Sequence, residues 1–138
     1  MNLHKFNRYP SYAKGIIFLY AAGFLTMMIY HISSVFNFGL SARNIPLPIN
    51  VWYDMLGFLI VPFTLIMLFA KPKRGLVISV VVMVLTFIFD ALVRYILQDS
   101  SYADWFYYFE ISFAIFVLTS FPVMRIMVKP KKADEQYA

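Results

Sequence analysis

The stretch VPFTLIMLFAKPKRGLVISVVVMVL, residues 61–85, sets two apolar runs on either side of a short basic segment. The basic segment carries Lys71, Lys73 and Arg74, and the flanking runs carry no charged residue within this stretch. Long apolar runs are typical of transmembrane helices, and clustered Lys and Arg mark the cytoplasmic loops between such helices. The stretch therefore predicts two antiparallel membrane helices that are joined on the cytoplasmic side.

Composition extends this interpretation to the whole chain. Of the 138 residues, 62% are hydrophobic and only 14% are charged, whereas soluble domains carry about 25% charged residues. The apolar residues form four runs, each long enough at about 1.5 Å per residue to cross a hydrocarbon core of about 30 Å. We predict an all-α integral membrane protein, an antiparallel up-down bundle of four transmembrane helices. Its transmembrane domain is residues 15–128, with spans at about 15–38, 49–70, 75–97 and 102–128.

Within the second predicted span, Pro62 lacks the backbone N–H that an α-helix uses at that position. A proline inside a helix leaves the carbonyl four residues earlier without its donor and bends the helix. The sequence therefore predicts a distortion near Phe58, with Gly57 offering room for it.

The basic residues predict the direction of the chain. Ten of the twelve Lys and Arg residues lie before the first run, between the second and third, or at and after the end of the fourth. Because cytoplasmic loops of membrane proteins are enriched in Lys and Arg, we expect residues 1–14, the middle connection and residues 129–138 in the cytoplasm. Trp52 and Trp105 then lie at the outer boundary, as an interfacial aromatic belt requires. The expected location is a bacterial cytoplasmic membrane.

With these directions, each predicted helix brings ionisable side chains to one level in the outer leaflet. These candidates for a ligand or proton site are His31, Asp54, Asp90, Arg94 and Glu110. The residues expected to support them are Tyr30, Ser34, Asn37, Thr86, Trp52 and Trp105. On the first helix we expect Tyr30, Ser34 and Asn37 to form a polar stripe with His31 at its flank.

Two interpretations of this layer stay open. Asp90 and Arg94 are four residues apart in the order that favours an ion pair within one helix, so they could be purely structural. Three carboxylates against one arginine, however, leave a surplus of negative charge in a medium that disfavours it, which is typical of a functional site. Asp54 and Glu110 could instead be solvated at the membrane boundary.

Several functional classes find no support in the sequence. There is no glycine-rich phosphate loop, no His-Glu-x-x-His motif and no cysteine, and we predict no cofactor and no metal site. The net charge of +5 arises from residues that flank the apolar runs, so it indicates membrane topology and not nucleic-acid binding.

Three functions remain. The leading hypothesis is binding, and possible conversion, of a small lipophilic molecule in the polar layer, with the lipid bilayer as the surroundings. The first alternative is a non-enzymatic accessory, assembly or immunity-type subunit that docks to a larger membrane protein. The second is a homo-oligomeric transporter or channel, because one chain of four helices is small for a conduit.

Overall fold

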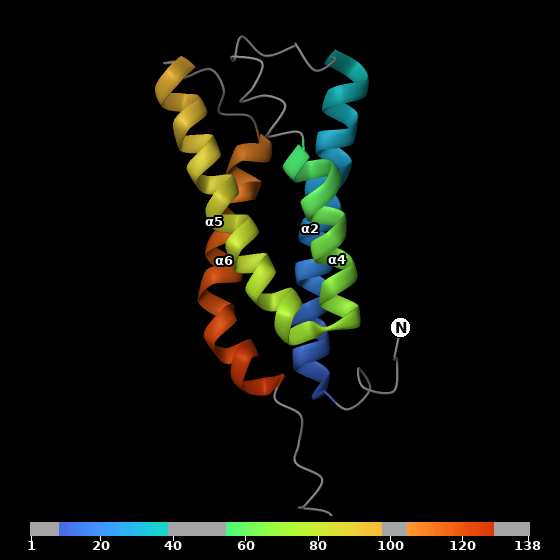
Figure 1. The fold of residues 1–138 in the computed structure, drawn as a ribbon. Coiled ribbons are helices and arrows are strands. Elements are labelled where there is room, and N and C mark those ends of the chain that lie inside the picture. Colours follow the sequence, from blue (N-terminus) through green and yellow to red (C-terminus); the bar gives the residue numbers. More distant parts are fainter. Residues whose placement is uncertain (1–8, 39–54, 98–104, 129–138) are drawn as a thin grey trace, which may run out of the picture.

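The computed structural model describes residues 9–38, 55–97 and 105–128, which form four packed helices (Figure 1). The first is α2, Ser11–Phe38, and the second consists of a π-helical turn η1, Leu56–Ile60, followed by α4, Val61–Ala70. The last two helices are α5, Pro72–Leu97, and α6, Trp105–Met127. The prediction of an all-α protein is therefore confirmed.

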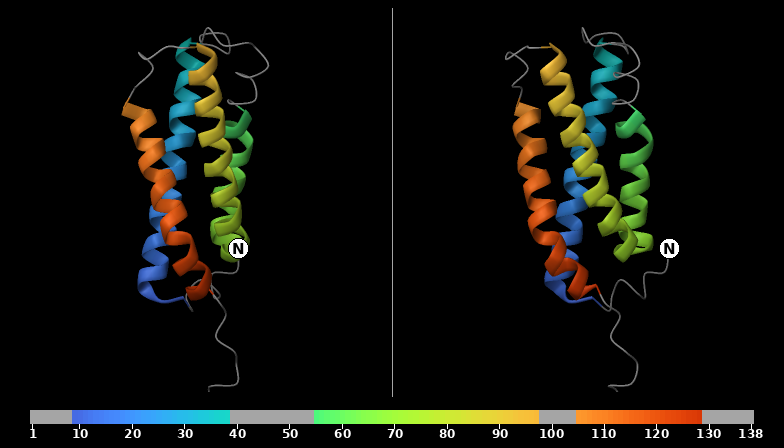
Figure 2. Two further views of the ribbon diagram at one scale, coloured as in Figure 1. Left: turned by 90° about the vertical axis from the view of Figure 1, so that its left-hand side faces the viewer. Right: turned by 60° about the vertical axis from the view of Figure 1, so that its left-hand side comes forward.

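Successive helices run in opposite directions, and each packs against its neighbours. The helices form a ring in which α4 contacts α2 and α5, and α6 closes the bundle by contacting α5 and α2. Figure 2 shows α4 and α6 at opposite edges of the bundle. The described cations, except Arg94 of α5, gather at one end, which is the lower end in Figure 1. We call this the basic end, and its residues are Lys14, Lys71, Lys73, Arg74 and Arg125.

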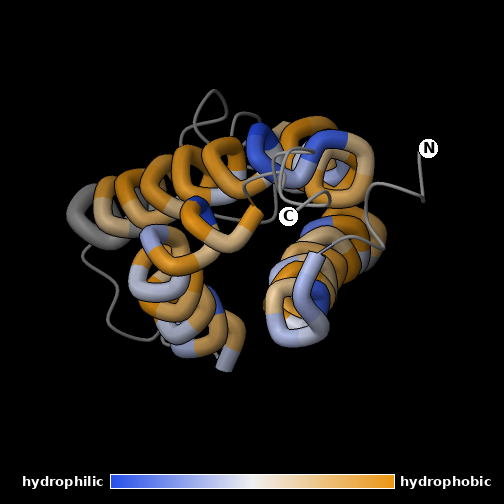
Figure 3. The backbone as a smooth tube through the Cα atoms, turned by 90° about the horizontal axis from the view of Figure 1, so that it is seen from below, coloured by the Kyte–Doolittle hydropathy of each residue, from blue (hydrophilic) through white to orange (hydrophobic). Residues whose placement is uncertain are grey.

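Three helices are long and apolar enough to cross a membrane, through Ser11–Ser33, Pro72–Phe89 and Trp105–Met127. The fourth apolar helix, Gly57–Ala70, is shorter and spans only about 20 Å at the usual helical rise. The expected second span began at residue 49, and residues 49–54 lie outside the described part of the chain. Figure 3, seen from the basic end, shows hydrophobic residues on the outward faces of all four helices.

Buried positions follow a seven-residue repeat in every helix. On α2 the buried side chains alternate between steps of four and three residues, as do those on α6. Such spacing is typical of helices that cross at a shallow angle, as in four-helix bundles. The repeat on α2 is Ala13, Ile17, Tyr20, Phe24, Met27 and His31, and on α6 it includes Phe106, Glu110, Phe113, Val117 and Met124.

The second helix is irregular where the sequence predicts it. The π-helical turn η1 ends two residues before Pro62 and includes Phe58, the residue whose carbonyl proline leaves without a donor. One turn further along, the hydroxyl of Thr64 donates a hydrogen bond to the Ile60 carbonyl at 2.7 Å, which satisfies this buried side chain within its own helix. The wider turn brings the backbone at Gly57 against α2.

A single residue, Lys71, connects α4 to α5. Its N–H donates to the Met67 carbonyl, and its own carbonyl accepts from the N–H groups of Arg74 and Gly75, each bond being 2.9 Å long. The turn is tight because Gly75 has no side chain: a Cβ atom there would lie 2.6 Å from the Cα of Leu68. The two helices thus meet backbone to backbone at the basic end.

Candidate functional site

The contact between α2 and α6, which we call the α2–α6 seam, keeps one antiparallel register along its length. Near the basic end the Tyr20 hydroxyl donates to the Val117 carbonyl at 2.9 Å. Further up, the rings of Phe24 and Phe113 meet edge to face with centroids 5.1 Å apart, and His31 meets Phe106 at 6.1 Å. In these three pairs, the residue number on α6 falls by as much as the residue number on α2 rises. The same register sets Glu110 opposite Met27, one helical turn nearer the basic end than His31.

His31 is only 2% exposed and is enclosed by three elements. Its ring contacts Phe106 of α6 edge-on and lies beside Tyr30 of its own helix. On the third side, a Cβ atom at Gly57 would overlap the Cβ and ring carbons of His31, so the backbone of η1 closes over the imidazole. The irregular turn before Pro62 therefore helps to position this histidine.

Glu110 is 3% exposed and belongs to the buried face of α6. Phe106 lies one turn before it and Phe113 about one turn after it, and both rings are buried. Glu110 therefore lies on the same buried face of α6 as these two phenylalanine rings. Burying a carboxyl group in apolar surroundings is costly unless hydrogen bonds or a charge partner compensate for it.

Aromatic rings cap the His31 side of the site. Tyr30 stacks flat on Phe106, with ring centroids 3.5 Å apart and planes inclined by 7°. Trp105 meets Tyr30 edge-on at 6.1 Å and is itself 60% exposed. One face of this aromatic group therefore packs against the seam while its other side reaches the molecular surface.

The structure describes only part of the polar stripe expected on α2. Ser34 and Asn37 have side chains outside the described part, Tyr30 is half-buried, and His31 is buried in the seam. The reason is the seven-residue repeat, which places His31 on the same line as Ile17 and Phe24. His31 therefore lies on the inward-facing line of this helix.

The other predicted residues are placed as follows. Thr86 is buried on the face of α5 that also carries Ser79 and Met83. Ser34 and Asn37 lie in α2, and Asp90 and Arg94 lie in α5, but their side chains are outside the described part of the structure. Trp52 and Asp54 are outside it entirely. Tyr30, His31 and Trp105 are thus brought together around Phe106, and the Asp90–Arg94 pair stays a prediction.

Sequence analysis missed a second polar group in the same seam. Tyr20 is fully buried, and its hydroxyl hydrogen-bonds with Ser120 at 2.8 Å in addition to the Val117 carbonyl. The Ser120 oxygen also lies within hydrogen-bond distance of the Phe116 carbonyl in its own helix, so the two hydroxyl hydrogens of Tyr20 and Ser120 are shared among three contacts. The available signal was a tyrosine inside an apolar run, because its hydroxyl needs a hydrogen-bond partner when it is buried.

Within residues 9–38, 55–97 and 105–128, no three His, Asp or Glu side chains lie close enough together to hold a metal ion. No protein-family model matches the chain, and neither curated proteins nor solved structures give a significant match.

Proposed function

We propose that the chain is an integral membrane protein with four spans, and that its α2–α6 seam binds a small lipophilic molecule in the outer half of the membrane. The observation that carries the proposal is the burial of His31 and Glu110 on successive turns of one seam. The supporting observation for orientation is the basic end, because cations gather on the cytoplasmic side of such bundles. Both termini and the α4–α5 connection are then cytoplasmic.

The chemistry of the two buried groups defines the polar part of the ligand. An imidazole offers one donor and one acceptor, and a carboxyl group accepts when ionised and also donates when protonated. Along the helix axis, the level of Glu110 and the level of His31 differ by four residues, or about 6 Å. A hydroxyl, amine or amide head group of the ligand fits between such partners. Asp90 and Arg94 of α5, and Asp54, remain candidates for completing this polar layer.

The aromatic residues of the seam suit the apolar part of the ligand. Phe24, Phe106 and Phe113 present ring carbon next to Glu110 and His31. Trp105 and Tyr108 are each 60% exposed at the same end of α6 and mark the side from which a molecule dissolved in the bilayer reaches the seam. Small-molecule sites combine such apolar walls with a few polar groups that fix orientation.

The test is to identify what the protein retains when it is purified from its membrane. Protein extracted in a mild detergent is analysed by mass spectrometry of its organic extract, for the wild type, Glu110→Gln and His31→Phe. We expect a lipophilic compound in stoichiometric amount with the wild type and its loss in both variants. Tyr20→Phe is the matched control, because it removes a polar group from the same seam away from the proposed site.

Each other outcome contradicts the proposal in a recognisable way. A stoichiometric protein partner without bound compound would favour the accessory-subunit hypothesis. A homo-oligomer without bound compound would favour the transporter hypothesis. Retention of the compound by Glu110→Gln and His31→Phe together would place the ligand elsewhere. Circular dichroism of each variant establishes that the helices persist.

A further inference from the structure

The basic end concentrates positive charge without nearby acids among the described residues. Lys14 lies near the start of α2, and Lys71, Lys73 and Arg74 surround the α4–α5 connection. The acidic residues that occur within the described ranges, Asp90 and Glu110, belong to the opposite half of the bundle. The lysines and the arginine of the α4–α5 connection are exposed.

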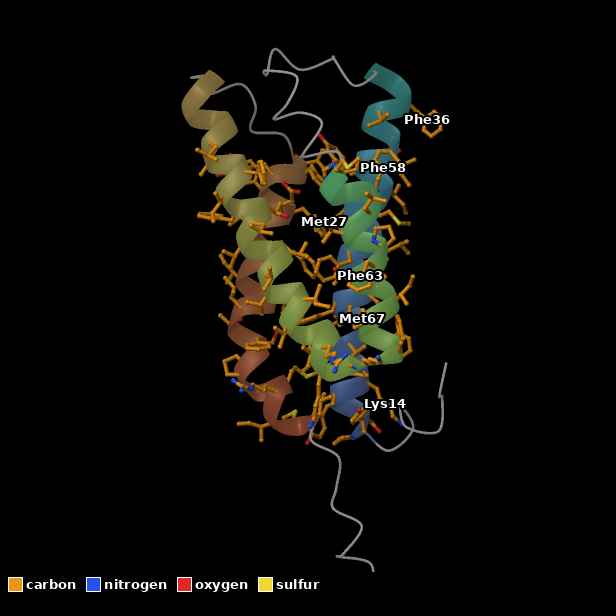
Figure 4. The ribbon with its side chains drawn as sticks, in the orientation of Figure 1. Lys14, Met27, Phe36, Phe58, Phe63 and Met67 are labelled. Atoms are coloured by element: carbon orange, nitrogen blue, oxygen red, sulfur yellow. The ribbon has the colours of Figure 1, made fainter. Side chains whose placement is uncertain are left out.

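The contact between α2 and α4 brings part of this charge to one corner. Phe18 of α2 and Phe69 of α4 meet with ring centroids 5.8 Å apart, and His31 meets Gly57 further up. The two helices therefore run antiparallel in nearly constant register. Continued towards the basic end, that register carries Lys14, one turn before Phe18, past the end of α4 at Ala70 to the level of the α4–α5 connection, which holds Lys71. Figure 4 shows Lys14 at the foot of α2, just below the lower end of α4.

An apolar ledge lies directly above these two lysines. Phe18 is 56% exposed and rests against Phe69, which is half-buried and precedes Lys71 by two residues. In a membrane-spanning bundle this side of the helices faces acyl chains. The corner therefore presents cations at the level of lipid head groups and exposed aromatic carbon one turn deeper.

We propose that this corner binds the head group of an anionic phospholipid, with Lys14 and Lys71 on the phosphate and one acyl chain along Phe18. Lysine side chains reach from an apolar surface to the head-group level while keeping their charge in water. Basic pockets between transmembrane helices on the cytoplasmic side recognise anionic lipids by the same chemistry. Charge complementarity selects an anionic over a zwitterionic lipid, and the Phe18 ledge selects a lipid over free phosphate.

Native mass spectrometry of the detergent-purified protein, titrated with phosphatidylglycerol or phosphatidylcholine, tests the site. We expect the wild type to bind phosphatidylglycerol in preference to phosphatidylcholine. The double variant Lys14→Gln/Lys71→Gln should lose that preference several-fold, whereas Lys14→Arg/Lys71→Arg should keep it. Arg125→Gln is the matched control, since it removes one charge from the same end of the bundle on α6 and should retain most of the preference.

Three results would overturn the proposal. Equal affinity of the wild type for both lipids would show that charge does not select the ligand. Equal losses in Arg125→Gln and the double glutamine variant would indicate a diffuse charge effect and no local site. Displacement of phosphatidylglycerol by inorganic phosphate at equal concentration would show that the ledge contributes nothing. The thermal unfolding temperature of each variant, followed by circular dichroism, verifies that the fold is intact.

Discussion

The hydroxyl group of Tyr20 joins α2 to α6 in the half of the bundle nearer the basic end. It reaches both the Val117 carbonyl and Ser120, while its ring packs edge-on against Phe113 and Phe116. Tyr20→Phe keeps the ring contacts and removes only the hydroxyl. We therefore expect a loss of about 1 kcal/mol in unfolding free energy, the usual size of a hydrogen bond between membrane helices.

Denaturant unfolding in detergent micelles, followed by circular dichroism, measures this loss. Ser120→Ala and the double variant complete a thermodynamic cycle. Because Tyr20 and Ser120 share a hydrogen bond, the double variant should cost less than the two single losses added together. Strictly additive losses would mean that the two hydroxyls do not interact.

At the scale of the helix, Gly75 sets how closely α4 and α5 approach. A methyl group there would meet the backbone of Leu68, which cannot move aside as a flexible side chain can. We expect Gly75→Ala to lower the unfolding free energy by about 2 kcal/mol, because overpacking forces the helices apart. The unfolding temperature measured by circular dichroism reports this effect.

Gly15 provides the matched control near the same end of the bundle. A Cβ atom at Gly15 would have no neighbour within 4 Å. Alanine also favours a helix over glycine by about 0.5–1 kcal/mol. Gly15→Ala should therefore leave the unfolding temperature unchanged or raise it. Equal destabilisation by both substitutions would contradict a specific close approach at Gly75.

Sequence patterns predicted the helices well but not which side of each helix faces inwards. The apolar runs gave three long helices and the distortion before Pro62, because length and proline chemistry act locally. Phe18 and Phe24 show why the inward faces of the helices could not be predicted. Both are phenylalanine, yet Phe18 is 56% exposed and Phe24 is fully buried. In a membrane the outer face is as apolar as the core, so hydrophobicity does not separate them.

The polar residues were better guides to the seam, with limits that have physical causes. His31 and Glu110 were singled out because ionisable groups are rare in apolar runs, and both are buried in the seam. Tyr20 was overlooked because its ring is apolar and only its hydroxyl needs a partner. The closeness of Gly57 to His31 depends on the packing of α4 against α2, which no local pattern encodes.

For the whole molecule, the distribution of charge predicts which end faces the cytoplasm. The chain has no cysteine, so single cysteines at Ser41, Ser101 and Ala133 can be labelled without background. An impermeant thiol reagent added to intact cells should modify the first two, because the positive-inside rule places them outside. The cysteine at position 133 should react only after lysis. Reversed labelling would show that the topology is opposite to the one predicted, with His31 and Glu110 in the cytoplasmic leaflet.

The one-residue connection at Lys71 also bears on how the protein is made. The apolar helix Gly57–Ala70 is short for retention in a bilayer by itself, whereas α5, which begins at Pro72, carries a full span. In the proposed topology, we expect the two segments, with a single residue between them, to enter the membrane together as a helical hairpin whose basic tip stays in the cytoplasm. The short helix Gly57–Ala70 would then insert together with α5, the longer helix that follows it. We then expect its insertion to wait until α5 has left the ribosome, so the order of translation would determine when the bundle can first assemble.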